Sequence, residues 1–105
     1  MNRIRTAALI LLAASIAAPA FAQSAGADTY KAKCAMCHGP DGTASTPTGK
    51  AMKVPSFKDP AEIKASDADL IATTKSGKGK MPSYSTKLSD AQIKEVIAYI
   101  RTLQK

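Results

Sequence analysis

The chain has 105 residues, of which 15 are basic and 8 are acidic, and its formal net charge is +7. This length predicts one small domain and excludes a multidomain enzyme, and two cysteines with one histidine are too few for a usual structural zinc site. The positive charge is compatible with nucleic acid, acidic lipid or an acidic protein partner, and because the lysines are scattered we expect no nucleic-acid partner.

The N-terminus has the pattern of a secretory signal. Arg3 and Arg5 precede an apolar run over residues 7–18, and the small-residue site Ala20-Phe21-Ala22 follows. A retained membrane anchor is the alternative, but the run is shorter than the roughly 20 residues that a spanning helix needs. We therefore expect residues 1–22 to be a signal peptide cleaved after Ala22, with no stable membrane insertion. Residues 23–105 then form the domain, with a net charge of +5.

The first helix of the domain is expected to run from about residue 24 or 25 to a cysteine motif. Gly26, Tyr30, Cys34 and Cys37 recur at helical spacing and share one face. Gly26 either allows another helix to approach closely or only loosens the N-terminal turn, and the spacing alone does not decide between these two roles.

Residues 34–38, Cys-Ala-Met-Cys-His, form the attachment signature for c-type haem. On one helical turn Cys34 and Cys37 face the same way, so each thiol can form a thioether with a haem vinyl group while His38 lies under the iron. We expect His38 to be the proximal ligand, with its other ring nitrogen bonded to a loop carbonyl between residues 39 and 47. A thioredoxin-like redox pair would need strands alternating with helices, and a disulfide within one helical turn is geometrically awkward.

Three further helices are expected after a loop. Residues 39–56 are rich in Gly, Pro, Ser and Thr and are predicted to be a loop that covers the haem edge. Asp59-Pro60-Ala61-Glu62 has the form of a capping box, so a short helix should begin there and bury Ile63. A second start signal at Ser66 leads into a helix that should stop at Gly77.

The C-terminal helix is the clearest element. Ser89 is the expected N-cap, and Gln92 completes a capping box. The apolar positions that follow form one stripe at helical spacing: Ile93, Val96, Ile97, Ile100 and Leu103. This stripe should pack on the Gly26/Tyr30 face of the first helix, with Tyr99 near the crossing. No convincing strand is present, so the predicted fold class is all-α.

A methionine is the candidate for the second axial ligand, because the chain has no second histidine. Met36 lies inside the attachment motif, on the wrong side of the macrocycle, and Met52 belongs to the proximal-side loop. Met81 lies in a glycine-rich segment between two helices, and Pro82 restricts the backbone after it. Flexible core filling is the alternative role for any methionine. We expect Met81 to be the distal ligand.

Together these features resemble the class I cytochromes c of the short-loop bacterial and photosynthetic type. The resemblance extends from Gly26 and Tyr30, through the Cys-x-x-Cys-His motif, to the ligand loop at Met81 and the last helix with Tyr99. It implies a small cytochrome c fold in which three to four helices wrap around one covalently bound haem c with its iron. Because the core is small, we expect the chain without haem to be poorly folded.

Carried over residue by residue, the resemblance implies these site residues: Cys34 and Cys37 for covalent attachment, His38 and Met81 for iron ligation, and, as a weaker transfer, Pro47 in the proximal loop. With the export signal, it implies a periplasmic, monomeric one-electron carrier, not an enzyme, whose partners are exported redox proteins. One group of lysines lies near the ligand loop or in the loop opposite: Lys50, Lys53, Lys75, Lys78 and Lys80. These lysines either steer partners with acidic docking surfaces or only keep the protein soluble.

Two other functions remain open at this point. A five-coordinate haem that senses a gas or acts as a weak peroxidase would require Met81 to be off the iron, and the sequence offers no distal histidine to assist peroxide cleavage. An electron-donating subunit of a larger oxidase or dehydrogenase would keep the same chemistry and change only the partner.

Overall fold

The computed structural model describes residues 19–105, with side chains from residue 24 onward. Residues 1–18, most of the predicted signal peptide, lie outside the described residues. The first helix, α1, spans Pro19–Lys33 and begins earlier than the expected start at residue 24 or 25. The alanines of this stretch favour a helix. Cleavage after Ala22 stays a prediction.

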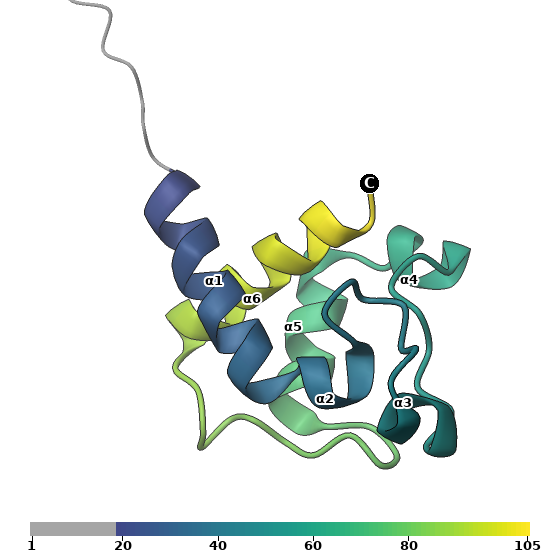
Figure 1. Ribbon diagram of the computed structural model, residues 1–105. Helices are drawn as coiled ribbons and strands as arrows, with labels where there is room; N and C mark the ends of the chain where they lie inside the picture. Colours follow the sequence, from purple (N-terminus) through teal and green to yellow (C-terminus); the bar gives the residue numbers. More distant parts are fainter. Residues whose placement is uncertain (1–18) are drawn as a thin grey trace, which may run out of the picture.

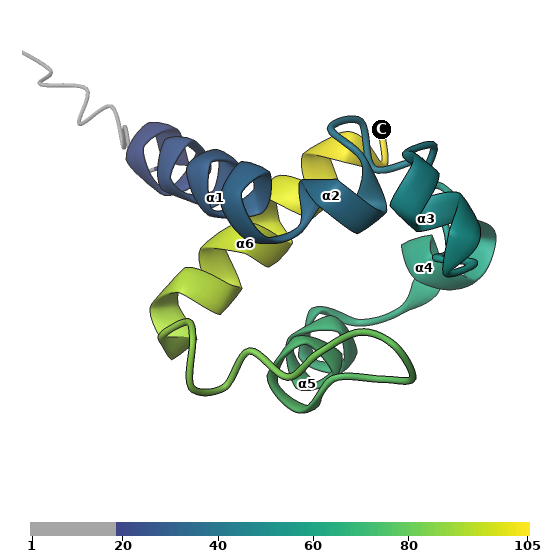
Figure 2. The ribbon, with the colours of Figure 1, turned by 60° about the horizontal axis from the view of Figure 1, so that its bottom comes forward.

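Helices α1 and α6 cross each other (Figures 1 and 2). Helix α6 spans Asp90–Leu103. Gly26 lies at the crossing, where an added Cβ would come within 2.3 Å of the Glu95 carbonyl oxygen and 3.2 Å of the Tyr99 Cβ. The close-approach role of Gly26 is therefore confirmed. Tyr30, one turn further along α1, is fully buried, and its ring centroid lies 5.2 Å from that of Tyr99.

A third long helix, α5, spans Asp67–Ser76 and packs against α6, and three short helices complete the fold: α2 (Ala35–His38), α3 (Pro47–Ala51) and α4 (Pro60–Lys64). The connection over residues 77–89 runs back from the end of α5 to the start of α6 (Figure 1). Within residues 19–105 the only β feature is an isolated bridge between Lys78 and Met81, so the predicted all-α class is confirmed. None of the helices in this part of the chain has the length and apolarity to cross a bilayer.

The side-chain caps of two helices follow the sequence signals. The Ser66 hydroxyl accepts from the Asp69 amide at 3.0 Å, and α5 ends at Gly77 with φ of +75°. At α6 the Ser89 hydroxyl accepts from the Gln92 amide at 3.1 Å, and the Gln92 side chain accepts from the Ser89 amide at 2.8 Å. Both helix starts were therefore predictable from local capping chemistry.

Three local expectations are wrong. Residues 39–56 are not entirely a loop, because Thr46 caps α3: its Oγ1 accepts from the Gly49 amide at 2.9 Å, and Pro47 takes the first helical position. At α4, Asp59 is the N-cap residue but its side chain makes no capping bond. Ile63 is 47% exposed instead of buried.

The hydrophobic core lies between α1, α5 and α6. It consists of Tyr30, Phe57, Leu70, Leu88, Ile93, Val96, Ile97 and Ile100. The predicted stripe of α6 is therefore buried, with Leu103 only partly buried at its edge. Several of these side chains have a second face that is turned toward a large cavity, and this cavity is the candidate functional site.

Candidate haem-binding site

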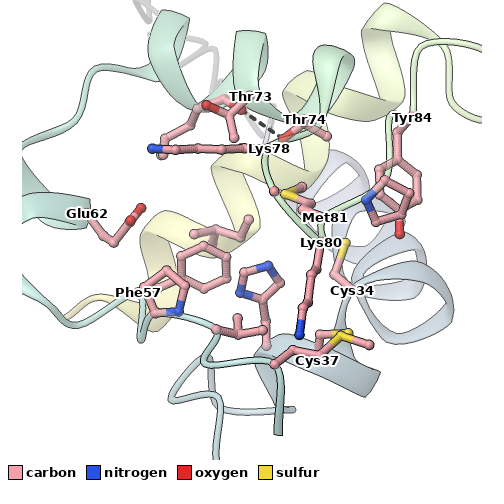
Figure 3. A pocket seen from close by; sticks show the side chains of 18 of the residues that line it. Cys34, Cys37, Phe57, Glu62, Thr73, Thr74, Lys78, Lys80, Met81 and Tyr84 are labelled. Atoms are coloured by element: carbon pink, nitrogen blue, oxygen red, sulfur yellow. Dashed lines mark hydrogen bonds between the residues drawn. The ribbon is translucent and has the colours of Figure 1, made fainter. Parts of the chain in front are cut away.

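A cavity of about 840 Å³ opens between the α1–α2 junction, the ends of α3 and α4, helix α5, the segment 78–84 and helix α6. Its volume is within the roughly 300–1,000 Å³ typical of cofactor and ligand sites. Four of the predicted site residues line it: Cys34, Cys37, His38 and Met81. Figure 3 shows Cys34, Cys37 and Met81 around the same space, although they come from opposite halves of the sequence. Pro47 is exposed at the start of α3 and does not line this cavity.

The cysteine motif occupies a short interruption between α1 and α2. The Cys34 amide donates to the Tyr30 carbonyl at 2.8 Å, and the Cys34 carbonyl accepts from the Cys37 amide at 3.2 Å and from the His38 amide at 2.9 Å. The chain therefore stays close to a helical path through the motif, and both cysteines line the cavity with free, partly buried side chains.

The pKa of the Cys34 thiol differs from that of a redox-active thiol. Burial, with a smaller contribution from Cys37, raises the pKa of the Cys34 thiol to about 11. Cysteines of disulfide oxidoreductases have lowered pKa values, which make the thiolate available for exchange. The site therefore does not favour the thioredoxin-like alternative.

His38 fits the role of a neutral metal ligand. Its ring stacks on Phe57 with centroids 4.3 Å apart and an interplanar angle of 15°. Burial lowers the pKa of His38, which favours the neutral imidazole that binds metal. Its Nδ1 is buried without a hydrogen-bond partner, so the expected bond to a loop carbonyl is not formed. Two backbone carbonyls at the start of this loop accept from other donors. The Gly39 carbonyl accepts from the Tyr30 hydroxyl at 2.6 Å, and the His38 carbonyl accepts from the Ala44 amide at 2.7 Å.

The loop after the motif is held against it by Thr46 and Gly49, which sequence reasoning did not single out. The Thr46 hydroxyl donates to the Met36 carbonyl at 2.6 Å while it caps α3. A Cβ on Gly49 would come within 2.2 Å of the Cys37 carbonyl oxygen, so only glycine allows this approach. The dipeptide Thr46-Pro47 was the available signal, because it combines a capping residue with a proline at the first helical position.

The segment that carries Met81 is tightly turned. Met81 and Lys78 exchange backbone hydrogen bonds of 2.9 and 3.1 Å, and a Cβ on Gly77 would lie 2.6 Å from the Met81 carbonyl oxygen. Met81 is half-buried and lines the cavity. Met52, at the end of α3, also lines it but is 42% exposed, and Met36 is 75% exposed and does not line it.

The wall of the cavity is apolar and its rim is mostly basic. Phe57, Leu70, Val96, Ile97 and Ile100 contribute the wall. The lysines that line the cavity are Lys33, Lys53, Lys78 and Lys80, against the acidic Glu62 and Asp69. Lys50 is exposed and does not line the cavity, and the Lys75 ammonium lies 3.0 Å from the Asp90 carboxylate. A large apolar cavity, two adjacent thiols and an unpaired imidazole nitrogen fit a covalently bound haem.

Comparison with known proteins gives the same result. Residues 21–100 match the family described as cytochrome C oxidase, cbb3-type, subunit III. Cytochrome c6 of Picosynechococcus sp. is 35% identical over an alignment of 111 positions, which covers 95% of this chain and 92% of that protein. The cbb3-type cytochrome c oxidase subunit CcoP of Azospirillum brasilense is 33% identical, and the match covers 80% of this chain but only 29% of that subunit. The solved structure of the c-type cytochrome KustC0563 has a TM-score of 0.70 at 28% identity, covering 76% of this chain and 98% of that one.

Proposed function

The chain belongs to the class I cytochrome c family, and we propose that it is a periplasmic one-electron carrier with histidine–methionine ligation. Membership of this family means that it carries a covalently bound haem c with iron and transfers electrons. In this proposal Cys34 and Cys37 would hold the haem through thioethers, and His38 and Met81 would ligate its iron. The observation that carries it is that these four side chains line one apolar cavity. Bound haem c supplies a one-electron couple at its iron.

The protein environment favours a high reduction potential. As an iron ligand, Met81 would favour the ferrous state more than a second histidine would. The apolar wall of Leu70, Val96 and Ile97 disfavours the extra positive charge of the ferric state, which acts in the same direction. Pro47 in the proximal loop stays an assignment by resemblance alone.

The first experiment expresses the chain with its N-terminal segment in a host that attaches haem c, and records ferric and ferrous absorption spectra. We expect covalent haem and the weak far-red band of ferric iron bound to a thioether. The band should disappear in Met81→Ala and persist in Met52→Ala, because Met52 is the other cavity methionine. Covalent haem without the band would favour the five-coordinate sensor or peroxidase.

The mass of the exported protein tests cleavage after Ala22.

The similarity to CcoP raises the alternative of an electron-donating oxidase subunit. That match covers less than a third of CcoP, whereas the match to cytochrome c6 covers nearly all of that protein. We therefore favour an independent, monomeric carrier. Size-exclusion chromatography of the exported protein from its native host checks this, since a stable oxidase subunit would elute with a large complex.

The basic rim supports a docking surface for acidic redox proteins. Lys78 and Lys80 closely precede the proposed ligand in the chain and line the cavity, so they can attract an acidic partner to the haem edge. The probe is electron exchange with an anionic reagent such as ferricyanide at low and high ionic strength. Lys78→Gln/Lys80→Gln should slow the reaction at low salt more than Lys94→Gln/Lys105→Gln, which removes the same charge at exposed positions on and after α6. Equal rates for the two double variants would mean that Lys78 and Lys80 only keep the protein soluble.

A further inference from the structure

The segment that carries Met81 is attached to α5 by its backbone. The Tyr84 amide donates to the Thr74 carbonyl at 3.0 Å, and the Gly77 amide donates to the Thr73 carbonyl at 2.8 Å. The Ser83 hydroxyl also donates to the Lys75 carbonyl. These bonds fix the segment relative to α5, but they do not fix it relative to α1, whose C-terminal end leads into Cys34.

The side chain of Tyr84 makes the connection to α1. Its hydroxyl donates to the Lys33 carbonyl at 3.0 Å, and both residues line the cavity. In Figure 3 Tyr84 lies at the Cys34 side of the cavity, next to the segment that carries Met81. One hydrogen bond therefore joins the two walls that carry the attachment cysteine and the proposed distal ligand.

The Lys33 carbonyl can accept this bond because the helix is interrupted at the cysteine motif. In a continuous helix the Lys33 carbonyl would accept from the Cys37 amide four residues later. The Cys37 amide instead donates to the Cys34 carbonyl at 3.2 Å, so the Lys33 carbonyl is left for another donor. The Tyr84 hydroxyl supplies that donor.

The ring of Tyr84 is also held in place from its own segment. The Lys87 ammonium lies 5.3 Å from the ring centroid, a distance at which a cation is attracted to the aromatic face. The Leu88 amide donates to the Tyr84 carbonyl at 2.9 Å and turns the chain toward α6. The residue is thus fixed through its amide, its carbonyl, its ring and its hydroxyl.

We propose that Tyr84 is a positioning residue: its hydroxyl ties the Met81 segment to the Lys33 carbonyl beside Cys34 and so keeps the Met81 side chain in the cavity. This inference rests on the proposed role of Met81 as the distal ligand. Without the bond, the segment remains attached to α5 but swings away from α1 more readily, and an added ligand competes more easily with the Met81 thioether.

The test is imidazole binding to the ferric holoprotein, followed by loss of the far-red thioether band. Tyr84→Phe keeps the ring and removes only the donor. Tyr99→Phe is the matched control, because Tyr99 is also half-buried and its hydroxyl makes no hydrogen bond within the described residues. Loss of a typical hydrogen bond should tighten apparent imidazole binding about two- to twelve-fold in Tyr84→Phe and leave Tyr99→Phe at the parental value.

Chemical denaturation followed by circular dichroism separates positioning from general stability. If Tyr84→Phe unfolds more easily but binds imidazole as the parent does, the hydroxyl supports only the fold and the proposal is overturned. Parental behaviour in both measurements overturns it as well. A parent protein without the far-red band would instead refute the Met81 ligation on which the inference rests.

Discussion

Gly26 of α1 and Glu95 of α6 are in backbone contact: a Cβ at position 26 would lie 2.3 Å from the Glu95 carbonyl oxygen. The two helices can approach this closely only because residue 26 has no side chain, and their contact buries Tyr30 and Ile93 completely. The crossing fixes α1, and therefore Cys34 at its end, relative to the α6 side chains that form the cavity wall.

Gly26→Ala should force α1 and α6 apart and lower the free energy of unfolding by about 1–3 kcal/mol. Denaturant unfolding of the holoprotein measures the change. Asp28→Ala, at an exposed position of the same helix, should change it by less than about 0.5 kcal/mol. Similar unfolding curves for Gly26→Ala and the parent would mean that the helices adjust without loss.

Tyr30 gives the fold a dependence on alkaline pH. Burial is the largest cause of this dependence, because it raises the pKa of Tyr30 well above its usual value. The raised folded-state pKa stabilises the fold fully below about pH 10, and this contribution is lost as the pH rises from there through the folded-state pKa.

Tyr30→Phe should remove this titration and leave the Gly39 carbonyl without its 2.6 Å donor. We expect a loss of about 1–3 kcal/mol at neutral pH for the unpaired buried carbonyl. The difference from the parent should then shrink above about pH 10. Unfolding free energies of the parent and Tyr30→Phe, measured across this range, test it. A constant difference between Tyr30→Phe and the parent would contradict the titration.

Predictions made from the sequence were accurate where the cause is local. The capping of α5 by Ser66 and of α6 by Ser89 depends on residues within one turn, and the 3.6-residue period of α6 determines its buried face. The haem motif is likewise local, and its residues at positions 34, 37 and 38 all line the cavity, while their roles in attachment and ligation stay predictions.

Predictions failed where contacts distant in sequence decide the conformation. Helix α3 had a local signal in Thr46-Pro47, but the bond from the Thr46 hydroxyl to the Met36 carbonyl is visible only in the folded structure. At α4 the residues that line the cavity are Ala61 and Glu62, so the neighbouring Ile63 faces solvent. The Tyr84–Lys33 bond joins residues far apart in the chain and is visible only in the folded structure.

Arg101 is a further long-range contact that the sequence did not indicate. Its Nε donates to the Asp67 carboxylate at 2.8 Å, its Nη2 donates to the Ala65 carbonyl at 2.5 Å, and its Nη1 reaches the Glu62 and Ile63 carbonyls at 3.4 Å. One guanidinium on α6 therefore holds the connection between α4 and α5, which forms part of the cavity wall.

Arg101→Lys should lower the free energy of unfolding by about 1–3 kcal/mol, because an ammonium keeps the charge but cannot reproduce the fork of donors. Thermal and denaturant unfolding of the holoprotein provide the measurement. Lys94→Arg makes the reverse exchange at an exposed position of the same helix and should be nearly neutral. Equal stability of Arg101→Lys and the parent would show that the Arg101 contacts contribute little.

Haem is expected to be part of the folded core. Phe57, Leu70, Val96, Ile97 and Ile100 belong to the hydrophobic core and also line the 840 Å³ cavity. Without haem these side chains have packing partners on one side only, and a domain this small has little other apolar surface to offset the loss.

Cys34→Ala/Cys37→Ala, which removes both attachment thiols, should therefore lose most of its helical circular dichroism and its cooperative unfolding transition. Met81→Ala is the control, because it keeps the attachment thiols and His38 and should remain folded with covalent haem. The attached haem stays on the unfolded chain, so it stabilises the folded state by filling the cavity and through its protein ligands, and the cysteine variant loses both contributions. If the cysteine variant without haem unfolds cooperatively with the helical content of the holoprotein, the crossing of α1 and α6 is sufficient to hold the cavity open unaided.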